Sequence, residues 1–218
     1  MSKQTFNPGL AILLTIMAVA GLMRIPNAAQ ITPWSNFSPI GAMALFGGAY
    51  FNKIGKAFLF PLLTLFLGDL IISIFIFHGK YGFIYEGWYW IYGIFLLIVL
   101  SGRLIIRKVT ITRVVIASVS AAVLHWLLAD LTMWIIGATD LRSMTPLSHD
   151  INGLIQCYTQ GFPLMKNFLA GTLIYSGIMF GVYEWVKRYH PKLALAAVSQ
   201  YNGKQESTNE KNELHSGN

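Results

Sequence analysis

The sequence predicts an all-α integral membrane protein: a compact bundle of about six transmembrane helices with both termini in the cytoplasm. Of its 218 residues, 55% are hydrophobic and only 11% are charged, whereas a soluble domain has roughly 25% charged residues. The apolar residues also gather in runs separated by short polar segments. This length suits one bundle rather than two lobes. The net charge of +7 is typical of basic helix ends that face anionic lipid, so we expect a bilayer and no nucleic acid as partner.

Apolar runs define the predicted helices, because a transmembrane helix needs about 20 mostly apolar residues. The run near the N-terminus is followed by Ala18-Val19-Ala20, a pattern that also occurs in cleavable signal peptides. Apolar residues continue beyond it to Met23, so we expect an uncleaved helix. The second run is short and rich in Gly and Ala, but it carries no charge. The predicted helices span residues 10–23, 39–51, 57–77, 88–100, 114–136 and 168–186.

The distribution of Lys and Arg predicts the orientation. With a cytoplasmic N-terminus, the inner segments hold ten basic residues and the outer segments four, as the positive-inside rule requires. We assign residues 1–192 to the transmembrane domain and 193–218 to a polar, disordered cytoplasmic tail. The inner residues are Lys3, Lys53, Lys56, Arg103, Arg107, Lys108, Arg113, Lys187, Arg188 and Lys192, and the outer ones are Arg24, Lys80, Arg142 and Lys166.

The predicted outer connections are longer and chemically more varied than the inner ones. They cover residues 26–38, 78–87 and 137–166. Long loops on one face of a compact domain usually serve binding or gating, so we select Trp34, Asn36, Glu86 and Trp88 as candidate ligand-binding residues. The alternative is a set of solvated connectors with a belt of Trp and Tyr at the membrane interface.

The ionisable residues Asp69, His125 and Asp130 lie well inside predicted helices, away from their ends. Such groups are costly in a membrane and usually face the bundle interior or a wet cavity. Trp126, Asp130 and Trp134 recur every four residues and share a helix face, whereas His125 lies about 140° from Asp130 and cannot share a narrow stripe with it. All five are candidate ligand-binding residues. A structural Asp and proton coupling are the alternatives for the acids.

Two sets of small residues predict close helix packing. Gly41, Ala44 and Gly48 form one face of the short second helix. This set predicts tight packing, with the alternative of a half-helix whose N-terminus points at an anionic ligand group. The other set lies on the first helix and could face the bundle or a partner subunit: Ala11, Thr15 and Ala18.

Several motifs resemble an uncharacterised bacterial family assigned to membrane transport. They are Asn36-Phe37-Ser38-Pro39-Ile40-Gly41-Ala42, Leu45-Phe46-Gly47-Gly48-Ala49-Tyr50-Phe51, Pro61, Gly68-Asp69, Gly102-Arg103-Leu104, and a run from Pro163 through Asn167 to Glu184. The resemblance covers residues from about 24 to 187. It implies a multi-pass protein of the bacterial cytoplasmic (inner) membrane.

The architecture also distantly resembles the substrate-binding (S) components of energy-coupling factor transporters. That resemblance implies capture of a vitamin or cofactor precursor from outside. It also implies a transmembrane coupling subunit and cytoplasmic ATPases as partners. S components contact the coupling subunit through an Ala-x-x-x-Ala face on the first helix, which Ala11 to Thr15 only approximates.

The function that we predict is therefore transport of a small-molecule substrate, captured in an outward-facing pocket. We expect no enzymatic activity, and we assign no catalytic residue, no metal ligand and no cofactor. One alternative is an intramembrane enzyme that uses His125, Asp130 and Asp69, although the sequence lacks His-x-x-x-His, Gly-x-Ser-x-Gly and Cys-x-x-Cys motifs. The other is a structural membrane subunit. Cys157 is the only cysteine, which excludes a disulfide within the chain.

Overall fold

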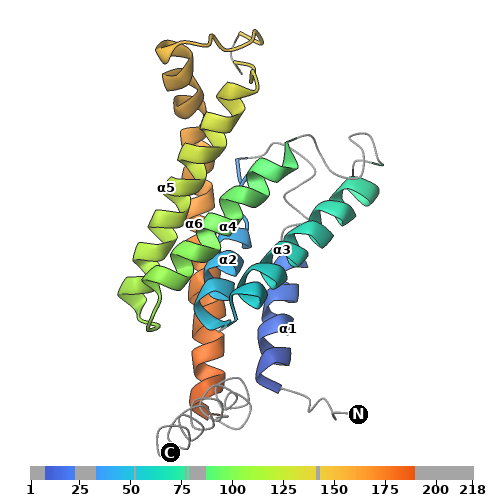
Figure 1. Ribbon diagram of the computed structural model, residues 1–218, viewed down its shortest axis with the longest axis vertical. Helices are drawn as coiled ribbons and strands as arrows, with labels where there is room; N and C mark the ends of the chain where they lie inside the picture. Colours follow the sequence, from blue (N-terminus) through green and yellow to red (C-terminus); the bar gives the residue numbers. More distant parts are fainter. Residues whose placement is uncertain are drawn as a thin grey trace, which may run out of the picture. The chain divides into compact units, whose positions relative to one another are not determined.

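The chain is all-helical in the part that the structure describes, as predicted (Figure 1). This computed structural model describes residues 8–22, 33–51, 53–76, 78, 87–140 and 143–189. Glu86 and the tail predicted at 193–218 lie outside the described residues. The helices are α1 (Pro8–Leu22), α2 (Ile40–Tyr50), α3 (Ile54–Ile71) with a π-helical turn at Ile72–Ile76, α4 (Trp88–Ile105), α5 (Ile111–Ile135) and α6 (Ile151–Tyr189).

Four of these helices are long and apolar enough to cross a membrane: α3 with its π-helical turn, α4, α5 and α6. The other two are shorter, with 15 residues in α1 and 11 in α2. At 1.5 Å per residue α2 is about 16 Å long, roughly half of the hydrocarbon thickness of a bilayer. The segment predicted as the weakest crossing is therefore a short helix that cannot span the membrane alone.

The described chain divides into two compact units, one of residues 8–16 with 181–189 and one that begins at residue 17 and ends at residue 180. In the first unit, the Thr15 hydroxyl donates to the Ala11 carbonyl, and Lys187 pairs with Glu184 at 2.9 Å. Thr15 is exposed and Ala11 is half-buried, and Ala18, which belongs to the second unit, is exposed.

Helix α2 is the centre of the second unit. Nine of its eleven residues are buried, and it contacts α3, α4 and α5. A Cβ atom at Gly41 would lie 2.7 Å from the Phe168 ring of α6, and one at Gly48 would collide with the Val99 carbonyl of α4. With Ala44 also buried, the small-residue face of α2 packs against neighbouring helices of the same chain.

The prediction that residues 137–166 form one long outer loop is wrong, because α6 begins at Ile151 and runs for 39 residues through Pro163. The segment before Pro163 is too polar for a hydropathy window to identify as a membrane helix. Its side chains bond to α5, which supports the helix at this point. The Tyr158 hydroxyl donates to the Leu127 carbonyl at 3.0 Å, and the Cys157 thiol donates to the Asp130 carbonyl at 3.3 Å. Lys166 therefore lies within α6 and not in a loop.

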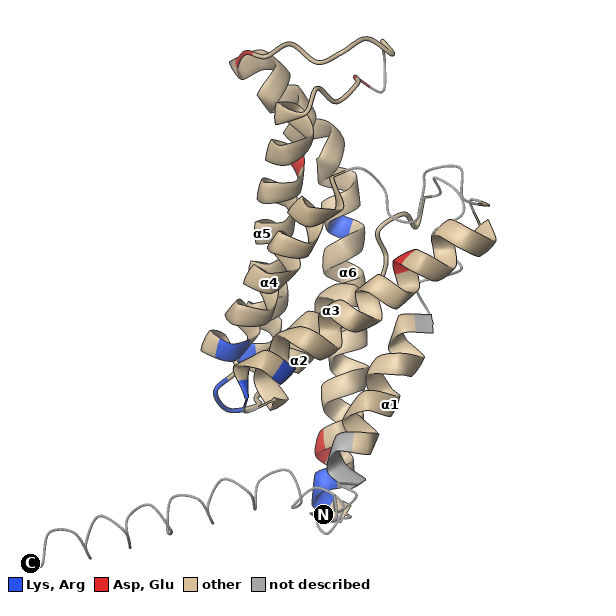
Figure 2. Cartoon of the chain, turned by 45° about the vertical axis from the view of Figure 1, so that its right-hand side comes forward, with Lys and Arg blue, Asp and Glu red and all other residues tan. Residues whose placement is uncertain are grey.

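Basic residues gather at one end of the second unit, where α2 meets α3 and α4 meets α5 (Figure 2). Arg103 joins the two connections, because its guanidinium donates to the Phe51 carbonyl at the C-terminus of α2 at 3.0 Å. Four acidic residues of this unit lie elsewhere along its helices and in the loop before α6: Asp69, Asp130, Asp140 and Asp150. The described part of this unit thus has one strongly basic end.

Candidate functional site

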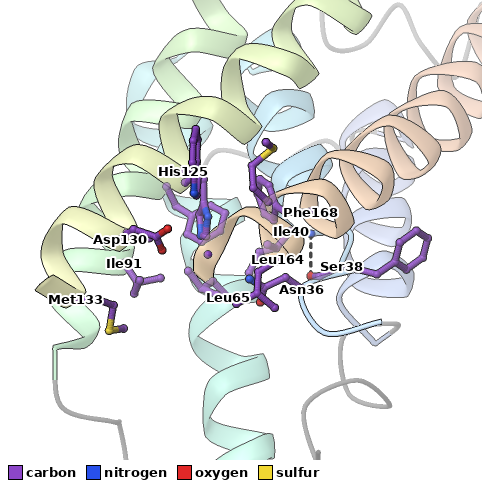
Figure 3. A pocket seen from close by; sticks show the side chains of 16 residues that line it. Asn36, Ser38, Ile40, Leu65, Ile91, His125, Asp130, Met133, Leu164 and Phe168 are labelled. Carbon is purple, nitrogen blue, oxygen red and sulfur yellow. Dashed lines mark hydrogen bonds between the residues drawn. The ribbon is translucent and has the colours of Figure 1, made fainter. Parts of the chain in front are cut away.

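A cavity of about 410 Å³ lies among α3, α4, α5, α6 and the segment that leads into α2 (Figure 3). It is walled mainly by apolar and aromatic side chains, with a few polar groups. Pockets for small molecules are typically concave, mostly apolar and about 300–1,000 Å³ in volume. The described lining residues are Asn36, Phe37, Ser38, Ile40, Leu65, Ile91, Phe95, His125, Trp126, Ala129, Asp130, Met133, Gly161, Leu164, Met165 and Phe168.

One wall of the cavity is the segment that precedes α2, and α6 holds it in place. The Asn167 side-chain amide donates to the carbonyls of Pro33 and Ser35, at 2.7 and 2.9 Å. Gly171 of α6 lets the backbone at Ser38 lie close to this helix, because a Cβ at position 171 would lie 2.7 Å from the Ser38 nitrogen. The Ser38 hydroxyl accepts from the Ile40 N–H at 3.3 Å (Figure 3). The strongest family-like motif of the sequence therefore forms part of the cavity wall.

His125 belongs to an aromatic group on the opposite wall. Its ring stacks on Phe168 with centroids 4.4 Å apart and planes 16° from parallel, and it contacts Phe95 at 5.7 Å. Neither ring nitrogen has a hydrogen-bond partner among the described residues. His125 thus presents an aromatic face and unused hydrogen-bonding capacity at the cavity.

Asp130 points its carboxylate into the cavity (Figure 3). The carboxylate lies against Gly161 of α6, and a Cβ at position 161 would overlap its Oδ2 atom. Oδ2 is buried and has no hydrogen-bond partner among the described residues. The Trp126 indole, one turn before Asp130 on α5, donates to the Tyr158 carbonyl at 3.2 Å. His125 and Asp130 point in different directions from α5, about 140° apart. Both line the cavity because it is wide enough to reach both sides of this helix.

The structure brings together four of the predicted binding residues: Asn36, His125, Trp126 and Asp130 line the cavity. Trp134 shares a helix face with Asp130 but packs on His149, with ring centroids 5.6 Å apart.

The remaining described candidates are not lining residues. Trp34 is 63% exposed and packs edge-on against Phe37. Trp88 contacts Tyr92, whose hydroxyl donates to Asp69 at 3.0 Å. Asp69 is therefore a buried acid between α3 and α4 that is bonded to a protein donor.

Sequence reasoning missed the apolar half of the site. Phe95, Phe168 and Leu65 look like any other apolar residue of a membrane helix, so no sequence signal separates them from lipid-facing positions. Gly161 and Asn167 do carry a sequence signal, because a glycine and an amide stand out in an apolar run. In the structure Gly161 lies against Asp130, and Asn167 bonds to the Pro33 carbonyl.

The loop that leads into α6 ends in a charged cap. Asp150 accepts from the Gly153 N–H at 2.8 Å and from the Ser148 hydroxyl at 2.7 Å. These hydrogen bonds lower the pKa of the Asp150 carboxyl below its ordinary value of 3.8. The carboxylate therefore adds stability above pH 3.8, and this contribution is lost as the pH falls through the lowered pKa.

We expect Asp150→Asn to have the same thermal stability as the native chain at pH 6, because Asn is as good an N-cap as Asp. Below pH 4 the native chain should lose slightly more stability than the variant. Thermal unfolding of both proteins between pH 6 and pH 3 measures this difference, and parallel pH profiles would contradict the assigned cap.

Comparison with known families gives one match. A model described as a family of unknown function (DUF6580) matches residues 4–193. The chain belongs to DUF6580. The matched region of this DUF6580 member includes the whole cavity and every described helix. No curated protein and no solved structure matches the chain.

Proposed function

We propose that this DUF6580 protein is a membrane protein that captures a small molecule in its cavity for transport. The observation that carries the proposal is the cavity of about 410 Å³, with apolar walls and a few polar groups from α5 and from the segment before α2. That combination is typical of sites that bind a small organic molecule and fix its orientation.

Exposed apolar side chains support insertion in a bilayer. The outward faces of the four long helices expose many large apolar side chains. Soluble monomeric proteins rarely expose apolar patches of this extent to water. Examples from each long helix are Leu63 (44% exposed), Leu104 (56%), Ile116 (50%) and Ile174 (52%).

The cavity lies away from the basic end of its unit, which supports an outward-facing site. His125 is twelve residues from Arg113 on α5, or about 18 Å at 1.5 Å per residue. Because basic ends of membrane helices favour the cytoplasm, the cavity falls in the outer half. Ligand capture from outside a bacterial cell fits this placement.

The partners that we propose are those of an S component: a transmembrane coupling subunit and cytoplasmic ATPases. The small-residue face of α2 packs on α4 and α6 of its own chain, so α1 is the more suitable contact for a coupling subunit. Thr15 and Ala18 on that helix are exposed. A solitary carrier is the simpler form of the same proposal.

An intramembrane enzyme has less support. Asp69 is bonded to Tyr92 and does not line the cavity with His125 and Asp130. In the described part of the chain no group of three or more His, Cys, Asp or Glu side chains is placed to hold a metal ion.

The test is to fill the cavity. Ala129→Phe puts a ring into the lined space, so we expect the native protein, purified in lipid nanodiscs, to retain a small molecule that mass spectrometry detects and that this variant loses. Val123→Phe is the matched control, because Val123 lies on the exposed face of the same helix. The same preparations show which proteins co-purify.

Two results together would refute substrate capture. The native protein and Ala129→Phe would contain the same small molecules, and a panel of vitamins and cofactor precursors would cause no thermal shift in the native protein. Retained ligand without any co-purified ATPase would leave capture intact and exclude the S-component form.

A further inference from the structure

The cavity has a marked charge asymmetry. Of its sixteen described lining residues, one is acidic and none is Lys or Arg. Lys166 on α6 is engaged elsewhere, with its ammonium 5.4 Å from the centroid of the Phe162 ring. The first turn of α2 also reaches the wall, but its Ile40 N–H is already bonded to Ser38. An anionic ligand would therefore meet a carboxylate and no Lys or Arg side chain, with His125 as the one imidazole in the described lining.

The protein does not neutralise the one acid. The Oδ2 atom of the Asp130 carboxylate is buried and has no hydrogen-bond partner in the described chain, and no ion pair neutralises the group there. Two donors beside Asp130 bond to carbonyls: the Trp126 indole bonds to Tyr158, and the Cys157 thiol bonds to the Asp130 carbonyl at 3.3 Å. A buried carboxylate oxygen without a partner is costly, especially at membrane depth. A positively charged ligand group would remove that cost.

The other walls suit the body of such a ligand. Aromatic rings of Phe37, Phe95, Trp126 and Phe168 line the cavity from three helices and the segment before α2. The faces of aromatic rings attract cations, most strongly when water is excluded. The volume of about 410 Å³ is far larger than an inorganic cation needs, so the occupant also has an organic part.

We propose that the ligand of this cavity is a monovalent organic cation, such as a protonated or quaternary amine, whose charged group lies at Asp130 and whose apolar part lies among the aromatic rings. This inference rests on the proposed function, because it names the class of molecule that the same cavity captures.

Three probes of similar shape and different charge test it. Benzyltrimethylammonium, benzyl methyl sulfone and phenylmethanesulfonate each join a benzyl group to a tetrahedral head of charge +1, 0 or −1. Binding is measured by calorimetry and thermal shift on the full chain in nanodiscs of zwitterionic lipid. We expect the cation to bind at least about tenfold more tightly than the sulfone, a difference of about 1.4 kcal/mol, and the sulfonate to bind most weakly.

Variants locate the effect. Asp130→Asn keeps the shape of the side chain and removes its charge, so the preference for the cation over the sulfone should disappear while sulfone binding stays within about twofold. Asp150→Asn removes one carboxylate outside the cavity and should keep the preference. Ala129→Phe should block all three probes.

The outcomes separate the two proposals. If the sulfone or the sulfonate binds as tightly as the cation and Ala129→Phe blocks it, the cavity captures ligands but the cation inference is wrong. If no probe binds, the cation inference is wrong, and the retained small molecules of native protein and Ala129→Phe then decide on capture. If a probe binds equally well to Ala129→Phe, the cavity is not its binding site and both proposals fail. A preference for the cation that survives Asp130→Asn would also overturn the role of Asp130.

Discussion

Replacing Asp140 with Ala should unfold the loop between α5 and α6 and lower the stability of the whole protein by about 2–4 kcal/mol, because three hydrogen bonds to a charged acceptor are lost. Asp140 is buried, with 9% of the residue exposed. It accepts from Gln156 at 2.6 Å, from Gln160 at 3.0 Å and from Ser143 at 2.9 Å. The two glutamines lie one turn apart on α6, so a single acid fastens the loop to this helix.

Backbone hydrogen bonds of the loop also pass through residue 140. The Asp140 N–H donates to the Thr145 carbonyl, and the Met144 N–H donates to the Asp140 carbonyl, both at 2.8 Å. Asp140→Ala retains both groups, so the variant tests the side-chain bonds alone. With the carboxylate gone, two side-chain amides are left without their acceptor, each at a cost of about 1–3 kcal/mol if water does not replace it. Thermal unfolding in nanodiscs should show a midpoint lower by roughly 5–15 °C.

A compensating variant separates hydrogen bonding from packing. Replacing both partners of a buried polar pair by apolar groups is often nearly neutral. Asp140→Leu combined with Gln156→Leu and Gln160→Leu should therefore recover much of the stability that Asp140→Ala loses. A midpoint for Asp140→Ala within about 1 °C of the native value, well inside the shift expected for 1 kcal/mol, would show that the cluster does not hold the loop.

The helices were predictable because their apolar runs are long and their ends are basic or rich in turn residues. The start of α6 was not, since residues 151–166 mix apolar and polar side chains and include Pro163. Contacts with α5 support the helix in this segment, and contacts between distant segments leave no hydropathy signal. The same limit applies to Asp140, whose partners on α6 lie 16 and 20 residues later.

The polar half of the cavity was predictable and the apolar half was not. His125 and Asp130 stand out because ionisable groups are rare inside membrane helices. Leu65 lines the cavity while Leu63 is 44% exposed on the same helix, and both are leucines because lipid and protein interior are equally apolar. A helix that is apolar all round has no periodicity that marks its buried face.

Gly48→Ala should be among the most damaging single-methyl changes in this chain. A Cβ at position 48 would collide with the Val99 carbonyl and lie 2.9 Å from the Arg103 nitrogen, and both are backbone atoms of α4. A backbone cannot rotate away as a side chain can, so α2 and α4 would have to separate. Overpacking of this kind costs about 1–3 kcal/mol, and occasionally more.

The contact between these helices is reciprocal, which makes separation costly along its whole length. A Cβ at Gly102 of α4 would lie 2.7 Å from the Leu45 carbonyl oxygen of α2, and Arg103 bonds to the Phe51 carbonyl just beyond α2. Because Ile40 at the other end of α2 lines the cavity, a shift of this helix should also weaken ligand binding.

Gly93→Ala is the matched control, since it adds the same methyl group to α4 where no atom lies within 4 Å. It should be neutral or stabilise the helix by up to about 1 kcal/mol, while Gly48→Ala lowers the thermal midpoint and the monodisperse fraction on gel filtration. Equal stability of the two variants would mean that α2 and α4 do not pack this closely in the membrane. The position of α2 as part of the cavity wall would then be wrong.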